Sequence, residues 1–501
     1  MPNRLPFPLA LIAALASGGL LGLSYAPVAF WPAAILGVAA ITWLTTSQPG
    51  GGRAALVGYL AGLGMNAATI SWIGVLGWYV AVALVAFMSL WFALLGWALY
   101  RLDRLRWAPA WWAAAWVAME FGLSSVPLGG FGWIRLAFTT ADQPISGFLP
   151  VVGVAGVSFL VALAGGLLLA QVRFRRTIIP GALLVALLVV GGVLKFVPDP
   201  TPDATVTIGV VQGNVDGVGH GRPGYARSVT NNHLSETITL LAHVRTGLAK
   251  PPDFVLWPEN STDMDPIKDA DTRSLIVDSV RLTGVPILVG AVMEGPGPDE
   301  RQTTGLVWTS EGPSSRYDKR NLVPFGEWIP FRDVLLPRMP ILKQIGRQGV
   351  PGTEPGVLDV SVGDRVLKVG DVICFELAYD TTVYDTLRGG AQVLVVQSNN
   401  ATYAGTGQTY QQFEITRVRA MEARREIVVA TTNSFSGMIG TRGDVLAKTD
   451  EGVAASASFT VPLRAGLTTG VLLQPWLSYL LTLAALAGIA LSYRRPSVAQ
   501  R

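Results

Sequence analysis

Charged residues are nearly absent from the first 195 positions of this chain. Only 13 of the 72 charged residues lie there, and the other 59 follow. The N-terminal part divides into apolar segments, most of them close to the roughly 20 residues needed to cross a bilayer. Charged residues make up 14% of the whole chain, against about 25% in typical soluble proteins. The composition therefore indicates a membrane-embedded part rather than a set of soluble domains.

We expect eight membrane spans, seven in the N-terminal part and one near the C-terminus. A cleaved signal peptide is the alternative for the first segment, because Arg4 precedes an apolar run that ends near small residues. Six further spans follow directly, which favours an anchor. The expected spans cover approximately residues 7–23, 30–44, 54–72, 76–99, 109–123, 151–170, 178–194 and 471–493.

The short loops predict the orientation, because Arg and Lys are retained on the cytoplasmic side of a membrane. If there are eight spans, the basic residues fall in alternate loops, on one side of the membrane. We therefore expect both termini on the cytoplasmic side and residues 196–470 outside. The pI of 9.2 then arises mainly from the basic residues that set the orientation in the membrane. The sequence has no basic patch interleaved with aromatic residues, so we expect no binding of nucleic acid. The basic residues on the cytoplasmic side are Arg4, Arg53, Arg101, Arg104, Arg106, Arg173, Arg175, Arg176, Arg494 and Arg495.

One acidic residue in the membrane part needs a reason to be there. Glu120 lies near the outer end of the fifth expected span, where an ionisable group is costly and usually has a partner or a task. Arg135, at the end of the glycine-rich, apolar loop 129–135, is a candidate partner. This loop is either a lipid-binding site or an interfacial aromatic anchor with a snorkelling arginine.

After a linker at residues 199–203, short β-branched runs alternate with polar helical stretches, which is the layout of an α/β domain. Residues 334–345 fit neither element, and we interpret them as an exposed apolar loop facing the membrane. We therefore expect a membrane domain (1–198), a catalytic domain (199–465) and a C-terminal helix with a cytoplasmic tail (466–501). The expected strands are 205–212, 253–257, 286–293, 304–309, 366–373, 393–397 and 427–431, and the expected helices are 228–249, 270–283, 381–388 and 410–425.

Cys374 is the only cysteine in the 501 residues. A lone thiol cannot close an internal disulfide or build a zinc site by itself. It follows an apolar run that ends at Ile373, so we place it at the carboxyl end of a strand, where open α/β sheets carry their chemistry. The alternative is a buried thiol that acts as a small apolar filler.

A nucleophilic thiol needs a base, because its ordinary pKa near 8.5 leaves little thiolate at neutral pH. The three histidines, His220, His233 and His243, cluster around the first expected helix of the catalytic domain, so we expect them to pack or lie at the surface. Glu259 follows a strand directly and is a candidate base, provided that its pKa is raised. Lys319 is a candidate cation for an oxyanion.

These residues lie in motifs that resemble those of the nitrilase superfamily. The chain has a Trp-Pro-Glu that ends at Glu259, a Tyr-Asp-Lys that ends at Lys319, and a Cys-x-Glu that starts at Cys374. The chain as a whole resembles the apolipoprotein N-acyltransferase family. This resemblance is carried by the eight expected spans, by the Phe-Gly-Glu-Trp-Ile-Pro run that starts at Phe325, and by the motifs at 130–133 and 152–160 in the membrane part. The resemblance covers nearly the whole chain.

The resemblance implies an αββα sandwich and assigns the site residues. Two departures from the family pattern affect it: Thr402 stands where the family usually has tryptophan, and Gly132 stands between Phe131 and Trp133 where the family has proline. The implied roles are general base for Glu259, oxyanion-stabilising cation for Lys319, nucleophile for Cys374, supporting carboxylates for Glu327 and Glu376, and substrate binding for Phe375, Trp133 and Asn399.

The resemblance also implies the reaction. Cys374 would take a fatty acyl chain from a phospholipid as a thioester and pass it to the α-amine of a diacylglyceryl-cysteine apolipoprotein, with no metal or cofactor. We expect a monomer in the cytoplasmic membrane of a bacterium, with its catalytic domain outside. The alternatives are a membrane-tethered nitrilase or amidase that hydrolyses a small amide or nitrile, and a transporter or scaffold with an inactive enzyme domain.

Overall fold

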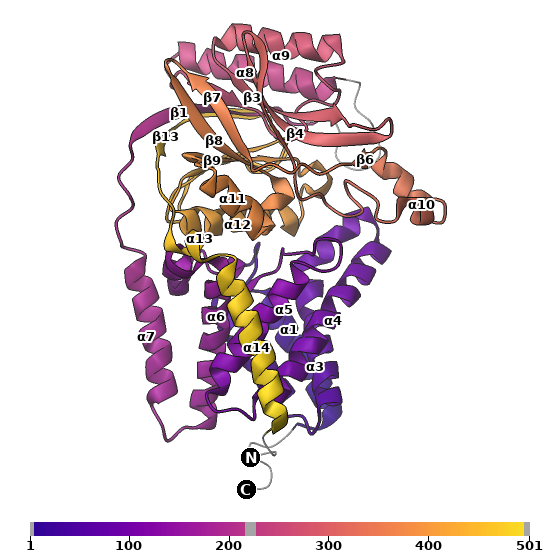
Figure 1. The fold of residues 1–501 in the computed structure, drawn as a ribbon, viewed down its shortest axis with the longest axis vertical. Coiled ribbons are helices and arrows are strands. Elements are labelled where there is room, and N and C mark those ends of the chain that lie inside the picture. Colours follow the sequence, from indigo (N-terminus) through magenta and orange to yellow (C-terminus); the bar gives the residue numbers. More distant parts are fainter. Residues whose placement is uncertain (1–4, 216–226, 495–501) are drawn as a thin grey trace. The chain divides into compact units, whose positions relative to one another are not determined.

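The computed structural model describes residues 5–215 and 227–494 (Figure 1). Its residues group into two compact units. Unit 1 consists of Met1–Pro198, Thr406–Glu422 and Thr468–Arg501, and unit 2 consists of Asp199–Gly405 and Ala423–Leu467. The segment Thr406–Glu422, which falls inside the catalytic domain expected from the sequence, thus belongs to unit 1. The functional domain limits at residues 198 and 465 stay predictions.

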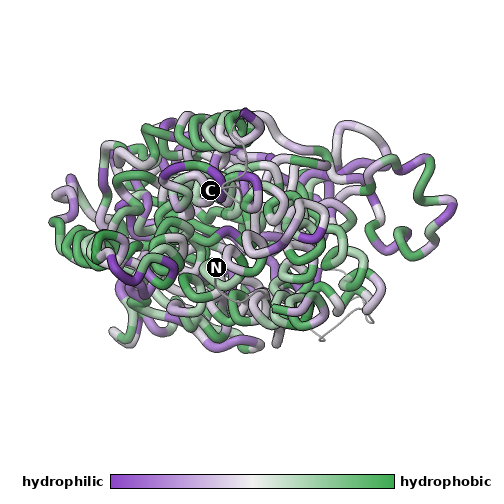
Figure 2. Tube along the Cα trace, turned by 90° about the horizontal axis from the view of Figure 1, so that it is seen from below, coloured by the Kyte–Doolittle hydropathy of each residue, from purple (hydrophilic) through white to green (hydrophobic). Residues whose placement is uncertain are grey.

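Every segment expected to span the membrane is helical in unit 1, and Figure 2 shows the green, hydrophobic stretches that run along much of the chain. Four helical stretches of the described residues are long and apolar enough to cross a bilayer: Gly51–Leu76, Trp78–Leu102, Pro144–Arg173 and Trp476–Arg494. Eight spans therefore remain a proposal. The helices of this part are α1 (Phe7–Gly22), α2 (Pro32–Thr46), α3 (Gly51–Ile70), α4 (Trp78–Leu102), α5 (Ala108–Leu123), α6 (Leu149–Arg173), α7 (Ile179–Leu194), α13 (Thr469–Leu473) and α14 (Trp476–Arg494).

Small residues and one buried ion pair hold the helices of unit 1 together. A Cβ on Gly58 of α3 would lie 2.2 Å from the carbonyl oxygen of Phe92 in α4, so glycine allows the two backbones to approach. Arg135 Nε lies 3.6 Å from Glu120 Oε2, and both side chains are buried. This confirms the predicted pairing of Glu120, in the fifth expected span, with Arg135 of the following loop.

Helix α12 (Gly407–Ala423) is tied to the helices of unit 1 through Gln411. The Gln411 Oε1 atom accepts hydrogen bonds from the indole nitrogens of Trp72 and Trp133, at 3.0 and 2.9 Å. Its Nε2 atom donates to two backbone carbonyls, those of Ala26 and Thr69. The amide is thus fully satisfied in a buried position, which explains why a segment of the expected catalytic domain groups with unit 1.

Unit 2 is a sandwich of two β-sheets, as the resemblance implies. The first sheet has the strand order β13-β1-β2-β3-β4-β5, with β6 beside β4, and the second has the order β12-β11-β10-β9-β8-β7. The strands are β1 (Ala204–Gln212), β2 (Phe254–Leu256), β3 (Ile287–Glu294), β4 (Glu300–Thr309), β5 (Gly312–Asp318), β6 (Gln348–Gly349), β7 (Val357–Val362), β8 (Arg365–Ile373), β9 (Val393–Ser398), β10 (Ile427–Thr431), β11 (Gly437–Ile439), β12 (Val445–Lys448) and β13 (Ala455–Leu463).

The alternation of side chains along the strands builds the core of unit 2. Val307 of the first sheet and Val369 and Val395 of the second sheet belong to one buried apolar cluster between the sheets. The opposite face of the first sheet packs against the helices α8 (Ser228–Arg245) and α9 (Ala270–Thr283) in a second cluster. Helix α11 (Asp380–Arg388) contacts β8 of the second sheet.

The seven expected strands are present, but the sequence interpretation missed β5, β6, β7, β11, β12 and β13. The segment 334–345, expected to be irregular, contains part of the short helix α10 (Arg332–Leu335) and a 3-10 turn at Pro340–Ile345. Within it, Val334, Met339 and Ile341 are exposed, whereas Leu342 is buried.

Candidate active site

Cys374 directly follows β8, as the sequence predicts. It opens a short 3-10 turn, Cys374–Ala378, and its φ of 54° lies in the left-handed region, which non-glycine residues rarely occupy. The side chain is half-buried. A sharp turn at a strand end aims the thiol away from the regular hydrogen-bonded backbone, which is where a substrate has access to it.

A buried cluster of charges joins the residues expected to act with the thiol. Glu259 follows β2, and Lys319 follows β5. Lys319 Nζ lies 2.8 Å from Glu259 Oε1 and 3.0 Å from the Glu327 carboxylate. The second oxygen of Glu259 accepts a hydrogen bond of 2.8 Å from the backbone N–H of Asn399. Lys319 and Glu259 are almost completely shielded from solvent.

Burial and charge shift the pKa values of Glu259, Lys319 and Cys374. Burial raises the pKa of Glu259 above its ordinary value, although the Lys319 ammonium opposes the shift. The carboxylates of Glu259 and Glu327 hold the pKa of Lys319 well above its usual range despite its burial. The pKa of Cys374 is also raised, chiefly by burial and by the Glu259 charge. The thiol is therefore protonated at rest, beside a carboxylate suited to accept its proton.

The end of β9 and the residues that follow it surround the thiol. Cys374 Sγ donates a long hydrogen bond, 3.8 Å, to Asn400 Oδ1. A hydrogen bond with Ser398 lowers the pKa of Cys374 in part. Tyr403 lies near the sulfur, and its pKa is raised to about 12 by burial and by the nearby Cys374. Asn400 and Tyr403 are parts of the site for which the sequence analysis assigned no role.

Glu376 is the most heavily hydrogen-bonded carboxylate of the site. Its two oxygens accept the hydroxyl of Tyr317, at 2.8 and 2.9 Å, and the backbone N–H groups of Ile373, Arg320 and Asn321. Because these donors come from the segments on either side of Lys319 and from the residue before Cys374, the carboxylate ties the segment of Lys319 to the segment of Cys374. The motif indicated Glu376, but no pattern in the sequence indicated its donors.

The remaining predicted residues lie in different surroundings. Phe375 is buried and stacks edge-on against Tyr379, with ring centroids 5.2 Å apart. The side chain of Asn399 accepts hydrogen bonds from Thr432 and from the Ala401 backbone. Trp133 is buried in unit 1. The substrate-binding roles of these three residues stay predictions.

The histidines lie apart from this chemistry. His233 is buried in α8, its ring lies 5.7 Å from that of Trp257, and burial lowers its pKa to about 4. It therefore packs as a neutral side chain, as expected, and His243 lies in the last turn of the same helix. His220 lies outside the described residues.

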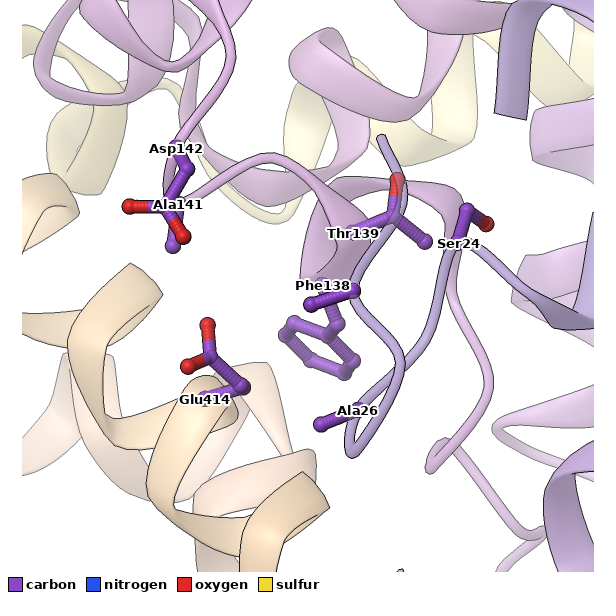
Figure 3. Close-up of a pocket in the computed structure, with 8 residues that line it drawn as sticks. Ser24, Ala26, Phe138, Thr139, Ala141, Asp142 and Glu414 are labelled. Carbon is purple, nitrogen blue, oxygen red and sulfur yellow. The ribbon is translucent and has the colours of Figure 1, made fainter. Parts of the chain in front are cut away.

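Unit 1 contains a small polar pocket (Figure 3). The carboxylates of Asp142 and Glu414 face it, with the ring of Phe138 beside them. Arg417 bridges the two carboxylates, at 2.6 and 2.8 Å. The pocket has about 10 Å³, room for roughly one water molecule. It is a structural ion cluster rather than a substrate site.

Comparison with known proteins identifies the family. Residues 17–167 match the model of the apolipoprotein N-acyltransferase N-terminal domain, and residues 251–460 match the model of the carbon-nitrogen hydrolases. An apolipoprotein N-acyltransferase of Mycolicibacterium smegmatis is 32% identical over 95% of this chain and 84% of the relative. The chain belongs to the apolipoprotein N-acyltransferase family.

Other members of the family are similar over comparable lengths. The apolipoprotein N-acyltransferase of Azotobacter vinelandii is 29% identical over 92% of this chain and 91% of its own. The enzyme of the same name from Coxiella burnetii is 27% identical over 87% and 90%. Among solved structures, a Nesterenkonia amidase of the nitrilase superfamily matches with a TM-score of 0.40 at 15% identity, covering 56% of this chain and 97% of the amidase.

Proposed function

We propose that the protein transfers a fatty acyl chain from a phospholipid, through a thioester on Cys374, to the α-amine of the N-terminal diacylglyceryl-cysteine of an apolipoprotein. The observation that carries this proposal is the buried Glu259–Lys319–Glu327 cluster, which acts on the thiol in a chain that belongs to the acyltransferase family. A membrane-tethered amidase is the second candidate, because Glu259, Lys319 and Cys374 would also serve amide hydrolysis.

The first half-reaction uses the raised proton affinity of the buried carboxylate. Glu259 takes the proton from the Cys374 thiol as the sulfur attacks the ester carbonyl of the phospholipid. The Lys319 ammonium stabilises the negative charge that develops on the carbonyl oxygen. Collapse of the tetrahedral intermediate breaks the C–O bond, and Glu259 returns the proton to the alcohol of the departing lysophospholipid.

The second half-reaction runs the same proton transfer with a different nucleophile. The α-amine of the acceptor attacks the thioester carbonyl, and Glu259 takes a proton from the nitrogen. The C–S bond then breaks, an amide is released, and the Cys374 thiolate recovers its proton from Glu259. Glu327, 3.0 Å from Lys319 Nζ, holds the ammonium in place through both halves.

Intact-mass measurement tests the proposal. The purified protein, incubated with a phospholipid, should gain one fatty acyl group, and Cys374→Ala should gain none. Glu259→Gln keeps the thiol but cannot accept its proton, so acylation should slow by about 10² to 10⁴-fold. Adding a diacylated lipopeptide should discharge the adduct as an amide. Normal acylation of both variants would refute the assignment, and release of fatty acid alone would favour the amidase.

We also propose that all eight expected helices span the cytoplasmic membrane, with both termini inside and the catalytic domain outside. Short helices such as α1, α2 and α7 are apolar throughout, and basic residues recur at alternate loops. Reporter fusions at Pro200 and at the C-terminus should report opposite sides, with Pro200 outside. Reporters on the same side would contradict the eight-span arrangement. We further propose that the protein is a monomer, which its mass in detergent solution would test.

A further inference from the structure

Asp371 is a buried carboxyl group that the proposed reaction does not use. It lies on β8, three residues before Cys374, and is completely shielded from solvent. Neither of its oxygens has a hydrogen-bond partner among the described residues. A buried, unpaired carboxylate is so costly that such a group stays protonated instead. Burial accordingly raises the pKa of Asp371 well above its usual range, and the nearby carboxylates of Glu376 and Glu259 act in the same direction.

A matching acceptor lies on the neighbouring strand. Gln397 on β9 is also completely buried, and its Nε2 donates a hydrogen bond of 2.5 Å to the backbone oxygen of Trp257. Because a carbonyl oxygen can only accept, the nitrogen end of the amide must face Trp257. The other end is then Oε1, which has no donor in the described part of the chain.

The two unpartnered groups lie at the same place between the sheets. Asp371 and Gln397 share the inward faces of their strands with the apolar cluster residues Ile373 and Val395. Gly305 of the first sheet lies opposite them: a Cβ there would lie 2.1 Å from Asp371 Oδ2 and 3.1 Å from Gln397 Oε1. One group has a proton without an acceptor, and the other is an acceptor without a donor. Glycine at position 305 leaves the room for them to meet.

We propose that Asp371 carries a proton at neutral pH, donates it to Gln397 Oε1, and so fixes the amide that holds the Trp257 end of β2. Glu259 lies two residues beyond Trp257, and Cys374 follows the strand that carries Asp371. The hydrogen bond between Asp371 and Gln397 therefore fixes the position of the general base, Glu259 after the first sheet, relative to the nucleophile, Cys374 after the second sheet. Asp371 and Gln397 are positioning residues, and this inference rests on the proposed function.

Ionisation of Asp371 would reverse the arrangement. A carboxylate repels Gln397 Oε1 and attracts an amide nitrogen, so the amide would turn and lose its hydrogen bond to Trp257. The charged or titratable groups that face Asp371 are Glu376, Glu259 and Tyr317. The positioning should thus hold at neutral pH and fail as the pH rises towards the raised pKa of Asp371.

Infrared spectroscopy of the full-length protein tests the protonation without reference to activity. The spectrum at neutral pH should contain the carbonyl stretch of a buried protonated carboxyl group, and Asp371→Asn should remove it. Gln397→Leu, which removes the acceptor, should move this band to higher frequency, whereas Glu376→Gln should leave it in place. If the difference between wild type and Asp371→Asn contains no such band, the inference is wrong, whatever reaction the enzyme performs.

The rate of acyl-enzyme formation tests the positioning. Asparagine can donate from its amide nitrogen to Gln397 Oε1, so Asp371→Asn should react much faster than Asp371→Leu, which has no donor. A misplaced base should slow Asp371→Leu by about 10²-fold, with kcat falling more than KM rises. The alkaline fall of the wild-type rate should disappear in Asp371→Asn. Equal rates for the two variants would overturn the positioning role.

Discussion

Lys319 Nζ lies 2.8 Å from Glu259 and 3.0 Å from Glu327, so one ammonium group faces two carboxylates in a site that solvent hardly reaches. The cluster has a net negative charge before substrate binds. This charge favours the protonated thiol of Cys374, and it keeps Lys319 charged for its proposed role at the oxyanion of the transition state.

Removing the ammonium should therefore cost stability as well as activity. Lys319→Met leaves the buried Glu259 carboxylate without its cation and close to the Glu327 carboxylate, and the free energy of unfolding should fall by about 3–5 kcal/mol. The double variant Lys319→Met/Glu259→Gln removes one of those charges, so it should recover part of the stability but none of the activity. Denaturant unfolding and acyl-enzyme formation measure the two effects. An unchanged free energy of unfolding in the single variant would contradict the ion cluster.

The acid side of the pH profile should report Glu259. Below its raised pKa this carboxyl is protonated and cannot accept the thiol proton, so the rate should rise as the pH passes through that pKa. The Glu327 charge contributes to the raised value. Glu327→Gln should therefore shift the acid limb to lower pH, even as it lowers the maximal rate.

The matched control for this shift is Glu294→Gln. Glu294 is an exposed carboxylate of the same unit, paired with Lys268 and Arg347. Its removal changes the net charge equally but leaves Glu259 untouched, so the limb should not move. If the acid limb of the pH–rate profile is unchanged in Glu327→Gln, or shifts equally in both variants, a group other than Glu259 determines it.

The hydrogen bonds that Glu376 accepts should contribute to the stability of unit 2, and this can be tested separately. Tyr317→Phe removes the hydroxyl that both carboxylate oxygens accept and leaves only backbone N–H donors. Loss of one donor to a buried charge should lower the free energy of unfolding by about 1–3 kcal/mol. Thermal unfolding of the full chain measures it. Unchanged stability would mean that the backbone donors alone satisfy the carboxylate.

The sequence predicts the ends of the central strands because each is a short β-branched run. Glu259 and Cys374 follow such runs, and their places at strand ends could be read directly. Two of the missed strands lack this signal: Gly312–Asp318 is mostly polar, and Ala455–Leu463 is rich in small residues. Their strand form comes from pairing, since β13 is hydrogen-bonded along the whole of β1. Tertiary contacts override weak local preference there.

Contacts between segments distant in sequence could not be predicted from single motifs. The fit of Gly305 against Asp371 needs the spacing of the two sheets, and neither residue has an unusual neighbour in the sequence. Gln411 likewise lies in an ordinary polar helix pattern, and only its bonds to Trp72 and Trp133 show that this helix belongs with unit 1. The proposed catalytic residues Glu259, Lys319 and Cys374 could be predicted from local motifs, but the residues proposed to position them could not.

The last prediction concerns how the thioester is protected from water. The segment 334–345 presents the exposed apolar side chains of Val334, Met339 and Ile341, whereas Leu342, which the sequence interpretation counted as surface, is buried. We expect this exposed apolar surface to meet lipid or an acyl chain. Replacing the three exposed residues with serine should leave the protein folded but lower the ratio of amide product to free fatty acid.

A matched control separates this role from a general loss of apolar surface. Ile238 and Leu248 are also exposed, but they lie on and just after α8, a helix that covers the sheet of Glu259 and carries no part of the site. Replacing them with serine should leave the product ratio unchanged. The ratio is measured by mass spectrometry of the products from a phospholipid and a diacylated lipopeptide. If the triple variant folds and its ratio equals that of the control, these residues do not shelter the acyl-enzyme.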